Sequence, residues 1–440
     1  MSHTYDSPIL AELAWRGFID QITHEELDEA LAKGPITLYC GFDPSAASLH
    51  VGNVVGLMAL AHFARHGHQP VALVGGATGL IGDPSGKDKE RELLDAGSLQ
   101  KNLKGIAAQI EGLLDAAQSL HTGDGSQDTQ KIPVVNNADW FKEWSFINFL
   151  RDIGKYFRVN QMIAKESVRA RLEEREQGIS YTEFSYMLIQ AYDFLELFKE
   201  RGCRLQIGGS DQYGNITSGI DLIRRREGET AFGLSFPLIT SADGKKLGKS
   251  VGGAIYLDPD LTSPYDFYQY WVNRPDEDCG MLLRLFTFLE REEIEELEKI
   301  IDDGENRGEV QRRLAKEVTE LIHGREEAEL ALRASKMLFG EAIEGLKDRD
   351  LSSIFADVPS TEIPRERLQA GELGILEIFV ETGLQKSNGA TRRLIKQGGA
   401  YLNNHRISDH DQVVGEDDLA SETMLVLRSG KKNYHVVRFT

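Results

Sequence analysis

Short apolar runs alternate with longer amphipathic stretches between Pro35 and about Phe236. Four of the runs, "ITLYCGF", "PVALVGGA", "IPVVNN" and "CRLQIGG", have the length of strands and are bounded by Gly, Pro or Asn. The stretches between them, such as "VGLMALAHFARHG" and "KNLKGIAAQIEGLLDAAQ", repeat apolar residues at helical spacing. This alternation predicts an α/β domain with a doubly wound parallel sheet. In such sheets ligands bind beyond the carboxyl ends of the strands.

After this region the composition and the periodicity of the sequence change several times. A loop rich in Gly and Lys, "TSADGKKLGKSVGGA", precedes a stretch with helical periodicity. A polar, Pro-containing segment then separates that stretch from a compact terminal unit. We predict an α/β domain over 1–239, a loop and connecting segment over 240–262, an α-helical domain over 263–346, a linker over 347–372 and a small α+β unit over 373–440.

Length and composition are those of a multidomain globular protein. A chain of 440 residues exceeds one ordinary core, so two to four domains are expected. No apolar run reaches the roughly 18 residues that a membrane span needs, so we expect no membrane association. The three cysteines lie far apart in the sequence, which predicts neither disulfides nor a zinc cluster and fits a reducing cytoplasm. We expect no protein-bound metal.

The charge of the chain is unevenly distributed. The net charge is -20, yet the residues from Glu372 onward hold nine basic and nine acidic side chains and are neutral. Within them, the segment from Thr382 to Ser408 carries five basic residues and no acid. An acidic body with a locally basic tail is one way to bind RNA at a single end of a protein.

The segment "LHVGN" follows the first strand and opens a helix. His50 and Asn53 lie three residues apart in the first helical turn, so they point to the same side. A histidine at a helix start is more often a structural hydrogen-bonding residue. Here, however, Gly52 permits close approach of a ligand, and the helix N-terminus favours anions. The pattern therefore also fits phosphate binding.

The loop "GKKLGKS" offers a second set of groups for phosphate. Lys246, Lys249 and Ser250 lie on a glycine-containing loop that could close over a polyphosphate. Such a loop is usually only a solvated surface. It is not a Walker A loop, because three residues rather than four separate its glycines. The glycines of "LVGGATGLIGD" likewise do not match a dinucleotide-binding fingerprint.

The helix "TEFSYMLIQAYDFLELF" carries a short polar stripe. Tyr186, Gln190 and Asp193 occur at i, i+4 and i+7, and the other faces are largely apolar. An ordinary solvent face would give the same spacing. The stripe ends within two turns, however, and tyrosine is unusual at a purely solvated position. We interpret it as the wall of a polar pocket.

Together these segments resemble the class I aminoacyl-tRNA synthetases, and among them the bacterial tyrosyl-tRNA synthetases. Residues 50–53, "HVGN", match the HIGH signature of that family, and residues 246–250, "KLGKS", match its KMSKS loop. "YCGFDPSAASLHVG", "ALVGGATGLIGDPSG", "TEFSYMLIQAYDF" and "LQIGGSDQYGNITSG" resemble its pocket segments in the correct order. Asn53 replaces the second signature histidine, and Gly248 replaces a serine of the generic loop. The resemblance implies a Rossmann-like catalytic domain.

The resemblance also implies an activity and a set of site residues. L-tyrosine would be activated with ATP to tyrosyl-adenylate, releasing pyrophosphate, and then transferred to the 3′ end of tRNA(Tyr). No tightly bound cofactor is implied, and Mg²⁺ would accompany ATP. The tyrosine-binding residues would be Tyr39, Thr78, Asp83, Tyr186, Gln190, Asp193 and Gln212. The nucleotide-binding residues would be Cys40, Asp43, Gly52, Asp211 and Lys249. The catalytic groups that bind phosphates would be His50, Asn53, Ser45, Lys87, Arg91, Lys246, Lys249 and Ser250.

The terminal unit resembles a small RNA-binding domain first described in a small-subunit ribosomal protein. A solvated basic helix would have the same composition, but the acid-free run favours contact with tRNA. The implied tRNA-binding residues are Arg392, Arg393, Lys396, Lys431 and Lys432. The resemblance further implies a cytoplasmic homodimer, formed through an insertion at about residues 136–175.

Two rival interpretations remain open at the level of sequence. A tryptophanyl-tRNA synthetase would share the fold and both signatures, although Tyr39, Asp193 and the basic tail argue against it. A catalytically silent relative that binds RNA would keep the same body. Intact His50, Lys246 and Lys249 favour an active enzyme.

Overall fold

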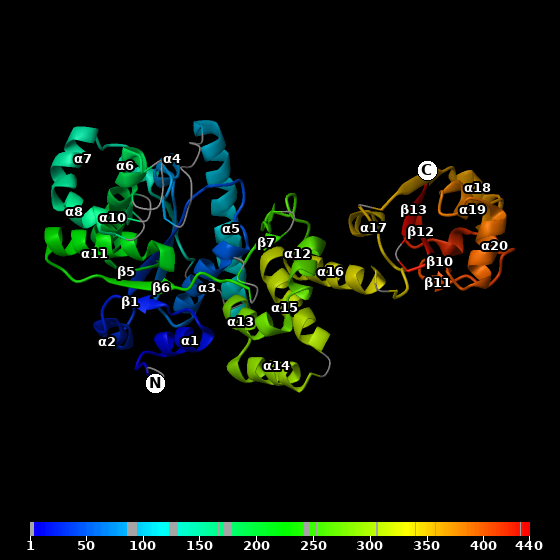
Figure 1. Ribbon diagram of the computed structural model, residues 1–440, viewed down its shortest axis with the longest axis horizontal. Helices are drawn as coiled ribbons and strands as arrows, with labels where there is room; N and C mark the ends of the chain where they lie inside the picture. The colour runs from blue at the N-terminus through cyan, green and yellow to red at the C-terminus, as the bar shows by residue number, and fades with distance from the viewer. Residues whose placement is uncertain are drawn as a thin grey trace. The chain divides into compact units, whose positions relative to one another are not determined.

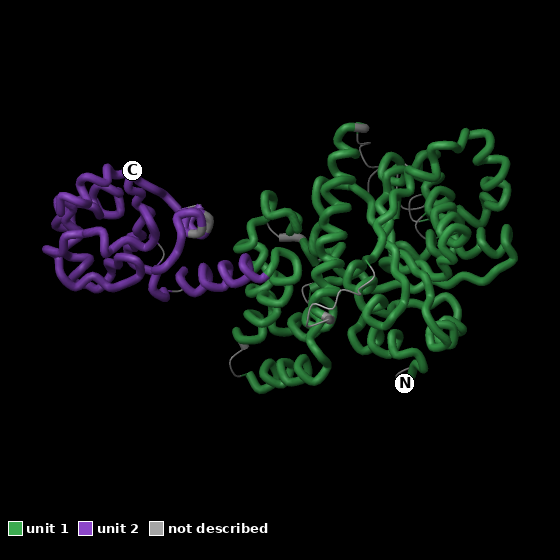
Figure 2. The backbone as a smooth tube through the Cα atoms, turned by 180° about the vertical axis from the view of Figure 1, so that it is seen from behind, with its two compact units in different colours: residues 1–324 green, residues 325–440 purple. Residues whose placement is uncertain are grey.

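The computed structural model divides the chain into two compact units, residues 1–324 and 325–440, which Figure 2 colours separately. It describes residues 4–85, 95–122, 131–165, 168–169, 172, 178–241, 244, 247–250, 253–304, 307–338, 340–356, 358–431 and 433–440. Among these residues no helix has both the length and the apolar character needed to cross a membrane.

The first unit is built on a six-stranded sheet in the order β1-β6-β5-β2-β3-β4. All neighbouring strands are parallel except β1, which is antiparallel to β6. The strands are β1 (Gln21–Ile22), β2 (Thr37–Phe42), β3 (Gln69–Val74), β4 (Val134–Asn136), β5 (Cys203–Gly209) and β6 (Phe232–Phe236). The α/β class and the parallel sheet predicted from the sequence are confirmed.

Helices cover both faces of this sheet (Figure 1). From β2 the sheet is extended through β3 to β4 in one direction, and from β5 to β6 in the opposite direction. Because the crossovers are right-handed, the helices of these two halves lie on opposite faces of the sheet. The helices up to β4 are α1 (Pro8–Arg16), α2 (Glu26–Lys33), α3 (Val51–Arg65), α4 (Thr78–Ile81) and α5 (Ala96–Thr122). Those before β6 are α6 (Ala138–Phe141), α7 (Phe146–Asp152), η1 (Gly154–Tyr156), α8 (Val159–Ile163), α10 (Tyr181–Arg201), η2 (Ser210–Gln212) and α11 (Tyr213–Glu227).

Four aromatic rings pack together around Phe149 of α7. Phe149 and Tyr192 contact each other, and each of them contacts Phe141 and Trp144, with ring centroids 5.4 to 5.9 Å apart. Such tilted and edge-to-face pairs stabilise beyond their buried area. This four-ring cluster joins the segment that follows β4 to the middle of α10.

A short hairpin and a helical bundle complete the first unit. The hairpin consists of β7 (Lys249–Ser250) and β8 (Gly253–Ala254). The bundle contains α12 (Pro264–Val272), α13 (Asp276–Phe286), α14 (Arg291–Asp303) and α15 (Arg307–His323). Buried Arg16 of α1 donates to the main-chain oxygens of Arg284, Thr287 and Leu289, and thereby fixes the end of α13 to the α/β domain.

The second unit contains a five-stranded sheet in the order β11-β10-β12-β13-β9. The strands are β9 (Ser360–Ile363), β10 (Ala400–Leu402), β11 (His405–Arg406), β12 (Met424–Ser429) and β13 (Asn433–Phe439). Its helices are α16 (Arg325–Leu338), α17 (Asp348–Ile354), α18 (Arg365–Gln369), α19 (Ile375–Glu381), α20 (Asn388–Lys396) and η3 (Glu416–Asp418).

Two predicted boundaries differ from this arrangement. Residues 347–372, predicted as a linker, contain α17, β9 and α18, and β9 forms the edge of the terminal sheet by pairing with β13. The predicted helical domain, 263–346, is divided after Gly324, so that α16 falls in the second unit. Asn404 explains this division, because its amide nitrogen donates to the carbonyl oxygens of Met337 and Glu341 and ties the end of α16 to the terminal sheet.

Candidate active site

A cavity of about 360 Å³ opens where β2 and β5 lie side by side at the centre of the sheet. The helices that follow these two strands lie on opposite faces, which is where doubly wound sheets bind ligands. Fourteen residues predicted from the sequence line this cavity: Tyr39, Cys40, Asp43, Ser45, His50, Gly52, Asn53, Thr78, Asp83, Tyr186, Gln190, Asp193, Asp211 and Gln212.

Larger hollows, of about 530 and 730 Å³, lie at the opposite edge of the sheet. Thr37, the first residue of β2, lines both of them, and neither contains a predicted site residue. Parallel α/β sheets bind ligands at the carboxyl edge, so we place the chemistry in the smaller cavity.

The floor of the cavity is formed by Tyr39 of β2 and Asp193 of α10. The Tyr39 hydroxyl is buried and has no hydrogen-bond partner among the described residues. Asp193 is only 1% exposed, and its two carboxylate oxygens accept hydrogen bonds from Asn137 Nδ2 (3.0 Å) and Trp140 Nε1 (2.8 Å). Burial raises the pKa of Asp193 to about 8, although both hydrogen bonds lower it. The cavity therefore holds one carboxyl group whose pKa lies near neutral pH.

Asp43 connects β2 to two other elements. Its carboxylate accepts hydrogen bonds from the Tyr186 hydroxyl (2.8 Å) and from Thr78 Oγ1 (2.7 Å). Gly75 is required beside it, because a Cβ atom at that position would overlap both Asp43 and Thr78. The resemblance assigns Asp43 to the nucleotide, and its hydrogen bonds position two residues, Tyr186 and Thr78, that the resemblance assigns to tyrosine.

A second polar network contributes Gln212 and Asp83 to the lining of the cavity. Gln212 Nε2 donates to Asp83 Oδ2 (2.7 Å), and Asn215 Nδ2 donates to Gln212 Oε1 (3.1 Å). Gln190 of α10 also lines the cavity, and its Oε1 is buried and has no partner in the described part of the chain. The cavity thus combines acidic and amide oxygens, a set that complements an ammonium group.

His50 caps α3 at the mouth of the cavity. Its Nδ1 accepts from the Gly52 backbone N–H (3.0 Å), and the His50 N–H donates to Asn53 Oδ1 (3.0 Å). With Nδ1 an acceptor, the proton of the neutral ring is on Nε2. His50 Nε2 and Asn53 Nδ2 are therefore the donors that this turn can direct at an anion, supported by the helix dipole.

The two signature segments are in contact. The Val51 N–H donates to the Ile255 oxygen, and the Ile255 N–H donates to the Gly248 oxygen. Gly248 has φ +84°, and a Cβ atom there would lie 3.3 Å from the Gly52 nitrogen. This left-handed conformation strains a residue with a side chain, which explains why glycine replaces the serine of the generic loop.

Some predicted residues cannot be placed. Lys87, Arg91, Lys246 and Lys432 lie outside the described residues. The backbone of Lys249 and Ser250 forms β7, while their side chains are outside the description.

Sequence reasoning missed three residues of the site. Asn137 and Trp140 hold the Asp193 carboxylate, and Gln206 of β5 lines the cavity. Asn137 could have been found, because it directly follows an apolar strand in "IPVVNN". Trp140 and Gln206 carry no comparable signal, since only the fold brings them to the cavity.

The pKa of Asp193 gives a prediction about pH. If the ligand donates a hydrogen bond to the ionised carboxylate, binding is weakened as the pH falls below about 8, because a proton must first leave. Trp140→Phe removes one hydrogen bond that lowers this pKa, so the pH midpoint of ligand binding should move upward. A shift of one pH unit would cost about tenfold in affinity at neutral pH.

Trp144→Phe is the matched control for this experiment. It alters a neighbouring indole of the four-ring cluster, whereas the side-chain hydrogen bonds to Asp193 described above come from Asn137 and Trp140. Its pH midpoint should equal that of the parent protein. A midpoint that moves equally in both variants, or in neither, would contradict the assignment of Trp140.

Four of the five predicted tRNA-binding residues are described, and all four lie in the second unit. Arg392, Arg393 and Lys396 are exposed on α20, and Lys431 is exposed in the turn between β12 and β13. The N–H of Gly430 donates to the Gly399 oxygen (2.7 Å), which holds that turn against the chain just after α20. The fold therefore brings together the two basic segments of the tail.

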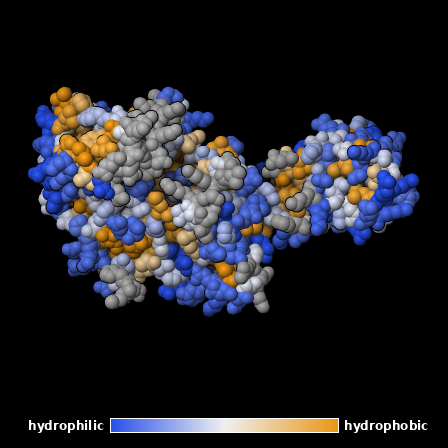
Figure 3. Space-filling model, in the orientation of Figure 1, coloured by the Kyte–Doolittle hydropathy of each residue, from blue (hydrophilic) through white to orange (hydrophobic). Residues whose placement is uncertain are grey.

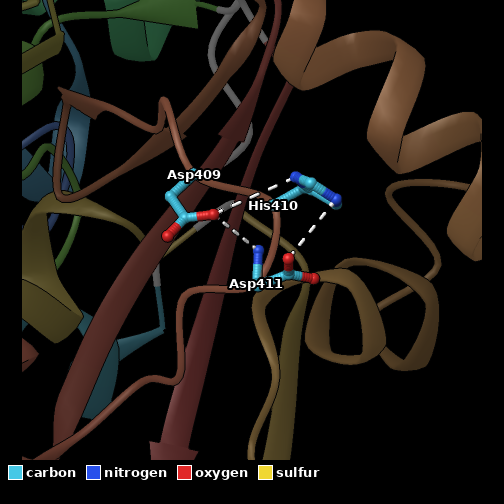
Figure 4. A group of neighbouring side chains, drawn as sticks. All are labelled: Asp409, His410 and Asp411. Atoms are coloured by element: carbon cyan, nitrogen blue, oxygen red, sulfur yellow. Dashed lines mark hydrogen bonds and ion pairs between the residues drawn. The ribbon is translucent and has the colours of Figure 1, made fainter.

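Asp409, His410 and Asp411 form a cluster on a loop of the second unit, shown in Figure 4. Their potential ligand atoms lie within 4.8 Å of one another, and all three residues are exposed. The Asp411 N–H donates to Asp409 Oδ1, as in an ordinary turn. Nothing else at this loop points to a ligand, and we assign no metal site to it.

Comparison with known proteins matches both parts of the chain. The family described as class I tRNA synthetases (W and Y) matches residues 31–340, and the SYY-like C-terminal domain of tyrosine--tRNA ligases matches residues 350–437. The tyrosine--tRNA ligase of Rhodopirellula baltica is 48% identical over 98% of this chain and 96% of its own length. The tyrosine--tRNA ligase of Roseiflexus castenholzii is 47% identical over 98% of this chain and 99% of its own length.

A solved structure agrees with these matches. The C-terminally truncated mitochondrial tyrosyl-tRNA synthetase of Aspergillus nidulans has a TM-score of 0.68 and 32% identity, covering 75% of this chain and 94% of its own. Since the relatives extend over nearly the whole sequence and both family matches agree with them, the chain belongs to the bacterial-type tyrosyl-tRNA synthetases of class I.

Proposed function

We propose that this protein joins L-tyrosine to ATP as tyrosyl-adenylate, releases pyrophosphate, and then transfers the tyrosyl group to the 3′ end of tRNA(Tyr). One observation carries the proposal: the floor of the cavity holds Tyr39 and Asp193, while its mouth holds His50 at the start of α3. An amino acid on the floor and a triphosphate at the mouth would meet in a single cavity.

The floor complements a phenol better than an indole. A phenol hydroxyl can donate to the Asp193 carboxylate and accept from the Tyr39 hydroxyl at the same time. An indole N–H can only donate, so tryptophan would leave the Tyr39 hydroxyl buried without a partner. Phenylalanine would leave the Tyr39 hydroxyl without a partner and would give Asp193 no hydrogen bond beyond those from Asn137 and Trp140. This argument favours tyrosine over the other two aromatic substrates.

We propose roles for the remaining walls from their chemistry. The substrate ammonium group would contact Gln190 Oε1 and two carboxylates. These are Asp43, which Thr78 and Tyr186 hold, and Asp83, which Gln212 holds. His50 Nε2 and Asn53 Nδ2 would donate to phosphate oxygens as negative charge moves to the leaving pyrophosphate. The β7–β8 hairpin, which carries Lys249 and Ser250, would close over those phosphates.

The substrate carboxylate is itself the nucleophile. It attacks the α-phosphorus of ATP, the bond to the β-phosphate breaks, and pyrophosphate leaves. No side chain needs to form a covalent bond. The residues therefore act by holding the two substrates in line and by stabilising charge, as is usual for transfer at phosphorus. ATP would enter as its complex with Mg²⁺, held by the phosphates of the nucleotide.

Exchange of pyrophosphate into ATP tests the proposal. With each of tyrosine, tryptophan and phenylalanine as the amino acid, only tyrosine should support rapid exchange. Comparable exchange with tryptophan would contradict the assigned substrate. Absence of exchange with all three would favour an RNA-binding protein without catalysis.

We further propose that the protein is a homodimer, assembled through α7 and α8. Phe146 and Ile147 of α7 are 64% and 69% exposed, and Val159 of α8 is 59% exposed. Hydrophobic residues gather over this part of the surface (Figure 3). A contiguous apolar patch is unusual on a monomer, and one patch that meets its own copy gives a closed two-fold dimer.

Charges in this patch should separate the subunits. The double variant Phe146→Asp, Ile147→Asp would bury carboxylates in the contact, so light scattering after gel filtration should give the mass of a monomer. Val413→Asp is the matched control, because Val413 is 51% exposed and lies outside the patch. A double variant that keeps the mass of a dimer would exclude α7 as the contact.

A further inference from the structure

Gln206 is a buried amide in the central strand β5 that the proposed tyrosine site does not yet use. It is only 2% exposed, it lines the cavity, and its Oε1 has no hydrogen-bond partner among the described residues. An amide buried in this way costs about 1–3 kcal/mol when it stays unpaired. Central strands of parallel sheets usually carry apolar residues. The position therefore requires an explanation beyond stability.

The register of the sheet places Gln206 beside the phenol end of the cavity. Gln206 of β5 is the direct partner of Tyr39 of β2 in the parallel ladder, so both side chains point to the same face. Asp193 reaches this face from α10. Two neighbouring residues on the floor, Tyr39 and Gln206, thus each carry a buried oxygen without a partner.

Hydrogen-bond geometry makes this amide complementary to a phenol. A phenol oxygen donates one hydrogen bond and accepts two. If it donates to Asp193 and accepts from Tyr39, one lone pair is still unused. The oxygen and nitrogen of a glutamine amide exchange places by rotation, so Gln206 can present an N–H to that lone pair.

We propose that Gln206 is a specificity-determining residue of the tyrosine pocket, whose amide gains its hydrogen bond when the phenol hydroxyl of the substrate is bound. This inference rests on the proposed function. With phenylalanine in the cavity, the amide stays buried and unpaired. Gln206 therefore favours tyrosine in two ways. Its amide forms a hydrogen bond with the phenol hydroxyl of tyrosine, and the same amide stays buried and unpaired when phenylalanine binds.

Gln206→Met tests the inference, because it keeps the approximate volume and removes the polar atoms. The kcat/KM for tyrosine in pyrophosphate exchange should fall roughly 5-fold, equivalent to about 1 kcal/mol for one neutral hydrogen bond. The kcat/KM for phenylalanine should rise by a similar factor, since no amide is left unpaired. Discrimination between the two amino acids should thus fall roughly 25-fold.

The ratio of the two amino acids separates recognition from a structural role. If the cavity were merely deformed, both kcat/KM values would fall together, and an unchanged ratio would overturn the inference. Gln206→Glu gives a second measurement if the Met variant folds poorly. Measured above the pKa of the new carboxyl group, this variant keeps the shape of glutamine without an N–H or O–H donor, so tyrosine kcat/KM should fall while that of phenylalanine should not rise.

A double-mutant cycle with Tyr39 provides a third test of the inference. In the cycle formed by Tyr39→Phe, Gln206→Met and the double variant, losses of tyrosine kcat/KM should not be additive, because both groups contact one oxygen. Strict additivity would overturn the shared contact. Failure of the parent protein to exchange with tyrosine would instead reject the proposed function, and the two failures are therefore distinguishable.

Discussion

Asp193→Ala should reduce tyrosine-dependent pyrophosphate exchange by on the order of 100-fold or more, since a hydrogen bond to a charged group contributes about 1.5–3 kcal/mol and each 1.4 kcal/mol is tenfold. The substitution also leaves Asn137 Nδ2 and Trp140 Nε1 without their acceptor in a buried site. The loss should appear in the kcat/KM for tyrosine, with the KM for ATP nearly unchanged, because His50 and α3 are not disturbed.

Glu196→Ala is the matched control for Asp193. Glu196 lies one turn further along α10, and its carboxylate accepts a hydrogen bond from the Tyr192 hydroxyl (2.8 Å), but it does not line the cavity. Its exchange rate should stay close to that of the parent protein. Near-parental exchange in Asp193→Ala would remove Asp193 from the recognition of tyrosine.

The same argument concerns discrimination against phenylalanine. As a class, tyrosyl-tRNA synthetases are known to discriminate tyrosine from phenylalanine by about 10⁵ without editing. The reason is that a site built to bind a hydroxyl group leaves buried polar groups unpaired when the substrate lacks that hydroxyl. The Tyr39 hydroxyl is one such group, and Asp193 would lose the hydrogen bond from the phenol while it keeps those from Asn137 and Trp140. Loss of Asp193 should therefore narrow the difference between the two amino acids as well as lower the rate with tyrosine.

Removal of the second unit should separate the two steps of the reaction. A chain that ends at Gly324 retains every described residue of the cavity, and it loses the basic helix α20. Pyrophosphate exchange should persist. Tyrosylation of tRNA should become undetectable at a tRNA concentration that saturates the full chain. This cut follows the boundary between the units, whereas a cut near Glu372 would leave β9 without its partner strand β13.

Single charges refine the truncation experiment. In the full chain, Arg392→Gln should weaken tRNA binding and reduce the slope of log affinity against log salt by about one, as expected for one lost phosphate contact. Pyrophosphate exchange should be unaffected. Equal loss of exchange and tyrosylation, in the truncated chain or in this variant, would show that the second unit has no separate part in binding RNA.

The elements that were predicted well depend on local pattern. The strand "CRLQIGG" coincides with β5, and the helix that follows His50 begins at Val51, because apolar runs and helix caps are encoded over a few residues. The stripe of Tyr186, Gln190 and Asp193 was visible for the same reason, and all three line the cavity. Their chemical roles remain predictions.

The elements that were missed depend on distant partners. The strand β9 reads "STEI", a polar segment that becomes a strand only by pairing with β13, more than seventy residues later. Gln206 resembles any polar residue in a strand until its ladder partner is known to be Tyr39. Trp140 reaches Asp193 only because the segment after β4 packs against α10. Such contacts are fixed by tertiary structure and have no signature in a short window.

The homodimer proposed through α7 would make amino-acid affinity depend on assembly, because the four-ring cluster lies between Phe149 of α7 and the residues that hold Asp193. Tyr192 of this cluster immediately precedes Asp193, and Phe141 immediately follows Trp140, whose indole holds the Asp193 carboxylate. Close-packed rings transmit small displacements instead of absorbing them. A subunit that loses its neighbour at α7 should consequently bind tyrosine less tightly, so titrations at nanomolar and micromolar protein would yield different dissociation constants.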